Sequence, residues 1–174
     1  MITLICGTNR PNNITSKVVV AYSELLKSRS IEHQTLFLED LPQDFAYNND
    51  IMGKKNERFT EIIRKNIEAA DKFVFFSPEY NGGFPGVLKA FIDSIFPKLL
   101  KGKKVAMVGV ASGRSGNLRG MDHLTNICNY LGMVVLPFKV PISSINQFLD
   151  ADNNLQHADT LNVLGRQVEE FIEF

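Results

Sequence analysis

Short apolar runs alternate along this chain with longer segments in which apolar residues recur at helical spacing. The short runs are rich in valine, isoleucine and phenylalanine and are too short for core helices, so they predict buried β-strands. These strands are expected at residues 2–6, 34–38, 73–76, 104–110 and 133–138. Amphipathic helices are expected from Thr15 or Ser16, as the cap, through Leu26, and at residues 57–69, 87–96, 118–131 and 158–174.

Strands that alternate with helices predict an α/β fold, in which a parallel sheet is covered by helices on both faces. The sequence contains no internal repeat, linker or low-complexity segment, so residues 1–174 are interpreted as a single domain. Residues 43–55 are polar and irregular and are interpreted as a surface excursion. Residues 142–149 show no clear pattern.

Composition narrows the possible functions. The 174 residues include 19 basic and 19 acidic side chains, and this neutral balance provides no electrostatic footprint for nucleic acid. No apolar run approaches the roughly 18 residues that a membrane span requires. No basic segment precedes the first apolar run, so we expect a cytoplasmic protein without a signal peptide. Cys6 and Cys128 are expected to be reduced core thiols, and no metal site is predicted.

Three of the predicted strand-to-helix loops are unusually polar, at residues 7–16, 77–86 and 111–117. In parallel sheets such loops meet at one edge, where ligands bind. The first loop combines Arg10 with several hydroxyl and amide side chains in front of a helix N-terminus. Such an arrangement suits a phosphate monoester, although these residues could also simply cap the helix and shape the turn. Neither a Walker loop nor a Gly-x-Gly-x-x-Gly fingerprint is present.

The second loop joins Tyr80 and Asn81 to two glycines, which allow the backbone to approach a flat ligand closely. Tyr80 can supply an aromatic surface, and Asn81 can supply both donors and acceptors. The alternative is a plain turn with a tyrosine facing solvent. The third loop is similarly small and rich in donors. Together the loops suit a ligand with a phosphate at one end and a planar polar ring at the other, as in flavin mononucleotide (FMN).

Two motifs make the sequence similar to a known family. They are Gly-Thr-Asn-Arg-Pro at residues 7–11 and, more specifically, Pro-Glu-Tyr-Asn-Gly-Gly-Phe-Pro-Gly-Val-Leu-Lys-Ala-Phe-Ile-Asp at residues 78–93. The chain resembles the NAD(P)H-dependent FMN reductases, a flavodoxin-like group that includes small quinone, azo-dye and chromate reductases. The similarity weakens only at residues 40–56 and 139–157. Many members have serine where Thr8 or Asn13 stands here.

This resemblance implies a flavodoxin-like three-layer sandwich with a five-stranded parallel sheet in the order 2-1-3-4-5. It also implies non-covalent FMN and a homodimer or homotetramer. By motif position, the residues implied at the phosphate are Thr8, Arg10, Asn13, Thr15 and Ser16. Those implied along the isoalloxazine ring are Pro78, Glu79, Tyr80, Asn81 and Gly82, with Ser112, Gly113 and Arg114 closing the other side.

The implied activity is an FMN-dependent NAD(P)H oxidoreductase. Hydride from NADPH or NADH would pass through the bound FMN to a small-molecule acceptor, which could be a flavin, quinone, azo compound or metal oxyanion. No side chain is nominated as catalytic, because the flavin carries the chemistry. Two alternatives remain open: a flavodoxin-type electron carrier, which the neutral charge disfavours, and a non-redox binding module on the same fold.

One cluster of charges is interpreted without a function. Lys98, Lys101, Lys103 and Lys104 lie between a predicted helix and a predicted strand. We interpret them as a solvated loop rather than as an anion-binding patch.

Overall fold

A computed structural model describes residues 1–48 and 57–174. The strands are β1 (Ile2–Cys6), β2 (His33–Phe37), β3 (Lys72–Pro78), β4 (Lys104–Val110), β5 (Val134–Val135) and β6 (Val140–Ile142). The α-helices are α1 (Thr15–Lys27), α2 (Phe45–Asn48), α3 (Glu57–Ile63), α4 (Gly86–Asp93), α5 (Leu118–Tyr130) and α6 (Ala158–Glu173). Shorter helical turns are the 3₁₀ segments η1 (Leu38–Asp40), η3 (Pro97–Leu99) and η4 (Ile145–Phe148) and the π-helical η2 (Arg64–Glu68), which directly continues α3.

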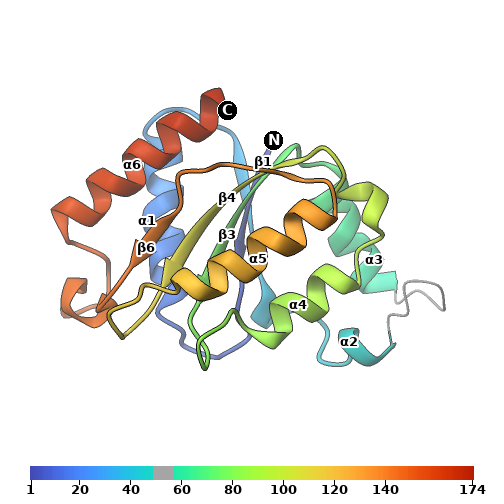
Figure 1. The fold of residues 1–174 in the computed structure, drawn as a ribbon, viewed down its shortest axis with the longest axis horizontal. Coiled ribbons are helices and arrows are strands. Elements are labelled where there is room, and N and C mark those ends of the chain that lie inside the picture. Colours follow the sequence, from blue (N-terminus) through green and yellow to red (C-terminus); the bar gives the residue numbers. More distant parts are fainter. Residues whose placement is uncertain (49–56) are drawn as a thin grey trace.

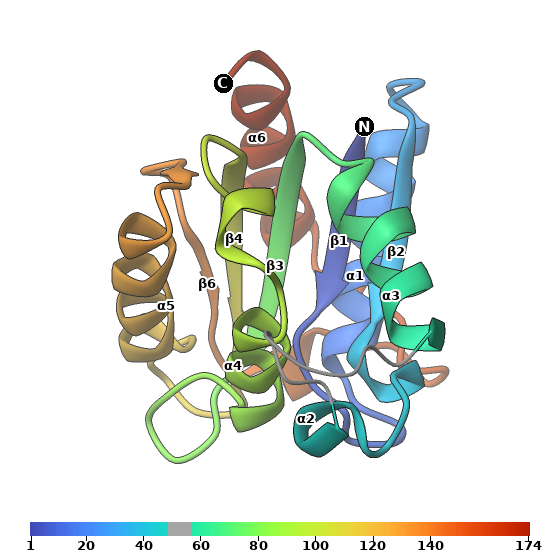
Figure 2. The same cartoon turned by 90° about the vertical axis from the view of Figure 1, so that its right-hand side faces the viewer.

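The strands form a parallel sheet between two layers of helices (Figures 1 and 2). Helices α1 and α6 cover one face, and α3, α4 and α5 cover the other. The strand order β2-β1-β3-β4-β5 confirms the predicted order and is the flavodoxin-like arrangement. The loops that follow β1, β3 and β4 gather at the bottom of Figure 1, opposite both chain termini.

The fifth strand position is divided between two short strands. β5 pairs with the start of β4, at Lys104 and Val105, whereas β6 pairs with its end, at residues 108–110. The prediction of one strand over residues 133–138 is therefore right only near its start. Pro137 lies in the interruption and has no N–H with which to continue a ladder. Residues 142–149, which show no clear pattern in the sequence, contain the end of β6 and the 3₁₀ turn η4.

Alternate side chains of each central strand enter opposite cores. In β3, Phe73 and Phe75 pack with residues of α3, α4 and α5, whereas Val74 and Phe76 pack with residues of α1 and α6. Because both faces of the sheet are covered, the central strands are continuously apolar in sequence, as parallel strands usually are.

Phe45 corrects the prediction of a surface excursion over residues 43–55. Its side chain is only 5% exposed and stacks on Phe59, with ring centroids 5.5 Å apart. A single aromatic residue in a polar segment has no periodic pattern, but it can still fill a gap beside α3 and α4. Residues 49–55 of that predicted segment lie outside the described residues.

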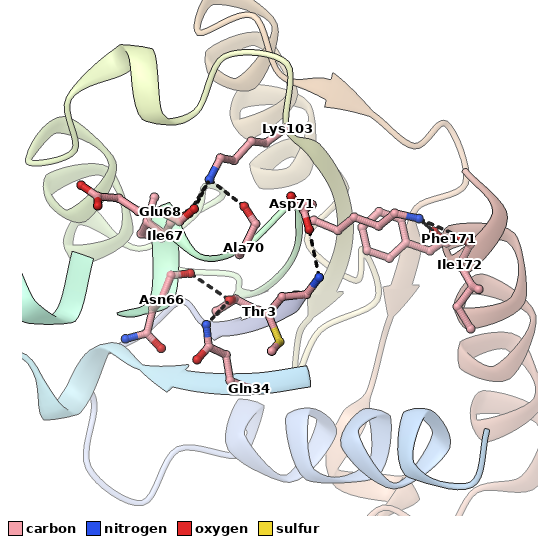
Figure 3. A network of polar contacts seen from close by, with 12 residues as sticks. Thr3, Gln34, Asn66, Ile67, Glu68, Ala70, Asp71, Lys103, Phe171 and Ile172 are labelled. Carbon is pink, nitrogen blue, oxygen red and sulfur yellow. Dashed lines mark hydrogen bonds and ion pairs between the residues drawn. The ribbon is translucent and has the colours of Figure 1, made fainter. Parts of the chain in front are cut away.

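Two lysines of the predicted solvated loop are instead used inside the fold. The Lys103 ammonium donates to backbone carbonyls at the end of the helix formed by α3 and η2, including that of Ala70 at 2.6 Å (Figure 3). The Lys104 ammonium donates to the carbonyl of Phe174, just after α6. Cationic side chains favour helix C-termini because the last carbonyls lack intrahelical partners. The interpretation as a solvated loop is therefore wrong for these two residues.

Candidate functional site

A cavity of about 450 Å³ lies at the carboxyl ends of the central strands, where parallel sheets bind ligands. Its volume falls within the range of small-molecule sites, about 300–1,000 Å³. All three predicted loops contribute to its wall, together with the start of η4. The lining residues are Arg10, Asn12, Asn13, Ile14, Thr15, Pro78, Glu79, Tyr80, Asn81, Val110, Ala111, Ser112 and Ile145.

The cavity brings together most of the residues predicted from the sequence. Those on its lining are Arg10, Asn13, Thr15, Pro78, Glu79, Tyr80, Asn81 and Ser112. Those predicted but not on the lining are Thr8, Ser16, Gly82, Gly113 and Arg114. The lining also includes residues that were not among the predicted cofactor contacts, although Asn12, Ile14 and Ala111 belong to the predicted loops. They are Asn12, Ile14, Val110, Ala111 and Ile145.

Asn13 holds the first loop in shape at the start of α1. Its Oδ1 accepts a hydrogen bond from the Ser16 N–H at 2.8 Å, and its Nδ2 donates to the Arg10 carbonyl at 2.9 Å. The Ser16 hydroxyl in turn donates to the Asn13 carbonyl at 2.6 Å. The prediction that Thr15 or Ser16 caps this helix is therefore wrong. The capping side chain belongs to Asn13, because asparagine at this position can reach the exposed N–H groups.

Tyr80 reaches from the second loop to the first. Its Oη lies 2.7 Å from Oγ1 of Thr8, which is completely buried and also accepts the Arg10 N–H at 3.2 Å. The Arg10 guanidinium lies over the Tyr80 ring, 4.6 Å from its centroid. Tyr80 therefore contacts two residues of the predicted phosphate loop.

The second loop forms a tight hairpin. Tyr80 and Gly83 exchange two backbone hydrogen bonds, of 2.9 and 3.1 Å. Between them, Asn81 and Gly82 have φ values of 52° and 78°. Two consecutive positive φ values indicate a type I′ turn, for which Asn-Gly is a strongly preferred pair. This turn determines how Tyr80 and Asn81 are presented at the cavity.

The third loop is joined to the second through Glu79 and Asn117. The Glu79 carboxylate accepts hydrogen bonds from the Ser115 hydroxyl and, at 3.2 Å, from the Asn117 N–H. Asn117 is completely buried, and its side-chain amide donates to the carbonyls of Ser77 at 2.8 Å and Pro78 at 3.1 Å. Sequence reasoning missed Asn117; the only local signal was an asparagine directly before a predicted helix.

The cavity lining combines polar and apolar groups. Arg10, the Thr15 hydroxyl and the start of α1 supply hydrogen-bond donors. Pro78, Val110 and Ala111 supply a less polar wall elsewhere on the lining. Within residues 1–48 and 57–174, no group of three or more His, Cys, Asp or Glu side chains could hold a metal ion.

Two further observations concern expectations drawn from the composition. Burial raises the pKa of the Cys6 thiol, beneath the first loop, to about 12, so it remains protonated and is a poor nucleophile.

No helix in the described part of the chain is long and apolar enough to cross a membrane.

Comparison with known proteins agrees with this geometry. A family model described as NADPH-dependent FMN reductase matches residues 1–147. The chain is 33% identical over 138 residues to an NAD(P)H-dependent FMN reductase of Pseudomonas aeruginosa, covering 76% of this chain and 74% of that protein. It is 30% identical over 131 residues to an NAD(P)H:quinone oxidoreductase of Solanum tuberosum, covering 74% of this chain and 67% of that protein.

A solved structure extends the similarity to almost the whole chain. The flavoenzyme NAD(P)H:(acceptor) oxidoreductase FerB of Paracoccus denitrificans superposes with a TM-score of 0.80 at 25% identity. The alignment covers 99% of this chain and 94% of that one.

Proposed function

This chain belongs to the NADPH-dependent FMN reductase family and is an oxidoreductase of the FMN and quinone reductase type; we propose that it binds FMN and uses NADPH or NADH to reduce a small acceptor. The observation that supports the proposal best is the convergence of three loops on one cavity, whose lining includes Arg10 and, at the start of α1, Thr15. Family membership also favours this enzyme over the two alternatives, the electron carrier and the non-redox module.

The residues at the cavity fit the phosphate of FMN. The first N–H groups of a helix lack intrahelical partners and favour an anion. Arg10 adds a guanidinium, which suits a phosphate because its N–H donors lie in one plane, and Thr15 adds a hydroxyl. In the described part of the chain no carboxylate forms an ion pair with Arg10. We propose that these groups bind the phosphate.

The other lining residues fit a planar polar ring. Pro78, Ala111 and Ile145 offer apolar surface, whereas Asn81 and Ser112 offer hydrogen-bonding groups. The type I′ turn and the Asn117 hydrogen bonds hold the backbone of residues 77–83 rigidly, which favours one orientation of a bound ring. We propose that this segment orients the isoalloxazine and that the third loop covers its other side.

FMN supplies the redox chemistry when it is bound. The protein's own task is then to bind, orient and leave access for two successive small molecules. Among the described residues, Glu79 is the one carboxylate on the lining, and its Oε2 already accepts hydrogen bonds from Ser115 and Asn117. We therefore assign Glu79 a role in spacing the loops, and we propose no side chain as a general acid or base.

The acceptor and the assembly complete the proposal. The relatives named above act on FMN or on quinones, so we propose flavins and quinones as the first acceptors to test, followed by azo compounds and metal oxyanions.

We also propose a homodimer or homotetramer. The exposed apolar side chains of Phe96 and Leu118, which are 45% and 52% exposed, are available for such a contact. Light scattering of the purified protein measures the assembly directly.

The deciding experiment is an absorption spectrum. The purified protein is mixed with FMN, freed of unbound flavin, and then treated anaerobically with NADPH or NADH. We expect a retained flavin band that either nucleotide bleaches, and the faster of the two identifies the preferred donor. A retained band that neither nucleotide bleaches would instead support an electron carrier. A colourless protein would support the non-redox module.

A further inference from the structure

We propose that Tyr80 is a positioning residue for the phosphate end of the site, acting through Arg10. This inference rests on the proposed function, since it concerns how FMN is held. The family resemblance implies that Tyr80 lines the isoalloxazine ring and that Thr8 holds the phosphate. The contacts of the two side chains indicate instead that Thr8 supports Tyr80 and that Tyr80 acts at the phosphate end of the site.

Thr8 anchors Tyr80. Its side chain is completely buried, does not line the cavity, and already has two partners, the Tyr80 hydroxyl at 2.7 Å and the Arg10 N–H at 3.2 Å. The residue before it, Gly7, donates to the Phe76 carbonyl at 2.8 Å, and a Cβ at Gly7 would lie 2.8 Å from the same oxygen. Thr8 therefore sits on backbone packed tightly against β3, which makes it a rigid support for the tyrosine hydroxyl.

Arg10 is held by the ring of Tyr80. The guanidinium lies 4.6 Å from the ring centroid, within the range of a cation–π contact. In the described part of the chain no acceptor takes a hydrogen bond from the Arg10 guanidinium, so its N–H donors stay available for a phosphate. An exposed arginine loses considerable rotamer freedom on binding a ligand. A stacked arginine has lost part of that freedom beforehand, which should tighten phosphate binding.

The same side chain joins the two halves of the site. The backbone of Tyr80 belongs to the type I′ hairpin, which also presents Asn81, whereas its side chain contacts the phosphate loop. Removing Tyr80 should therefore weaken binding of ligands that carry a phosphate more than binding of ligands that lack it. FMN and riboflavin differ by this phosphate alone.

The test measures the dissociation constants of FMN and riboflavin by flavin fluorescence on addition of apoprotein. Tyr80→Phe keeps the ring but loses the hydroxyl, and we expect FMN binding to weaken about 3- to 10-fold, the value of one hydrogen bond. Tyr80→Leu also loses the stacking, which adds about 2- to 5-fold for an exposed cation–π contact. Riboflavin binding should change less than about 2-fold in both variants, because sites that do not interact affect one another by no more than this.

Two further variants serve as controls. Tyr130→Leu removes a tyrosine that is 92% exposed and lies at the end of α5, away from the cavity lining, and it should change neither constant. In the double variant Arg10→Ala with Tyr80→Leu, FMN should bind no more than about 2-fold more weakly than in Arg10→Ala alone, because the two residues act as a unit.

The outcomes separate this inference from the proposed function. Equal weakening of FMN and riboflavin in Tyr80→Phe, or additive effects of Arg10 and Tyr80, would overturn the positioning role while leaving FMN binding established. Unchanged FMN affinity in both Tyr80 variants would do the same. A wild-type protein that binds neither flavin would overturn the proposed function and this inference with it.

Discussion

The side-chain amide of Asn117 donates a hydrogen bond to the backbone carbonyl of Ser77, 40 residues earlier in the chain, over 2.8 Å. This bond joins the start of α5 to the end of β3 directly beneath the cavity. Asn117 also has φ of 64°, in the left-handed region that asparagine tolerates better than most residues. One residue therefore combines a buried hydrogen-bonding role with a backbone conformation that few side chains accept.

Replacing Asn117 should separate these two roles. In Asn117→Gly the backbone keeps its preferred conformation but the buried hydrogen bonds are lost, so the free energy of unfolding should fall by about 2 kcal/mol. Asn117→Ala adds the cost of positive φ, about 1 kcal/mol more. Urea unfolding measures both. The matched control is Asn153→Gly, at an exposed turn residue with φ of 61°, which should be neutral or slightly stabilising. Equal effects at both asparagines would contradict the role given to Asn117.

The contrast between Tyr80 and Asn117 shows what could be read from the sequence. The loop around Tyr80 was recognised as a binding element because its glycines, asparagine and position after a strand are local signals. The role of Asn117 depends on Ser77 and Pro78, which no local pattern connects to it. Thr8 was placed on the right loop, but its burial behind Tyr80 could not be read from residue type alone.

The same distinction holds for the fold. The positions of the strands and helices follow from apolar periods, which are properties of neighbouring residues, whereas the strand order was implied by the family resemblance. The interruption of the last strand position is bridged by a distant glutamine, Gln167 on α6, and the burial of Phe45 depends on Phe59. The lysine contacts likewise join β4 to the ends of two helices. Contacts that depend on one side chain from a distant part of the sequence were therefore not predicted.

Arg10 should contribute to FMN binding chiefly through the phosphate. Arg10→Ala removes a charged donor from the cavity lining, so we expect FMN affinity to fall about 10- to 100-fold, the value of charge-assisted hydrogen bonds. Riboflavin affinity should change little. Fluorescence titration measures both, and the loss should shrink at high salt. Arg166→Ala is the matched control, since Arg166 also lies over an aromatic ring, that of Phe138, but does not line the cavity. Unchanged FMN affinity would remove Arg10 from the phosphate site.

The buried thiols predict a loss of stability at high pH. Burial raises the pKa of both Cys6 and Cys128 to about 12. A pKa raised in the folded state means that the unfolded state ionises first, so stability is complete below about pH 8.5 and falls as pH rises toward 12. Each thiol should cost about 2 kcal/mol between pH 8 and pH 10.

Urea unfolding at these two pH values tests the thiols, with Cys128→Ala as the comparison. The variant should lose about 2 kcal/mol less than the wild type between pH 8 and pH 10, whatever its stability at pH 8. In the native protein at pH 8, neither thiol should react with a disulfide reagent, because both are buried and protonated. Rapid labelling of either cysteine before unfolding would contradict this prediction.

Gln167 should stabilise the divided edge of the sheet. Its amide donates to the carbonyls of Met107 at 3.1 Å and Phe138 at 2.8 Å, where β4 pairs with neither β5 nor β6. Gln167→Leu leaves these buried carbonyls unsatisfied and should cost about 1–3 kcal/mol at any pH.

Gln167→Glu instead places a buried carboxyl against these carbonyls, and burial raises the pKa of such a group. Its stability should therefore fall as pH rises above about 4.3, the ordinary value for glutamate. Urea unfolding at pH 5 and pH 7 distinguishes the two variants, and a pH-independent Gln167→Glu would show that water reaches this edge.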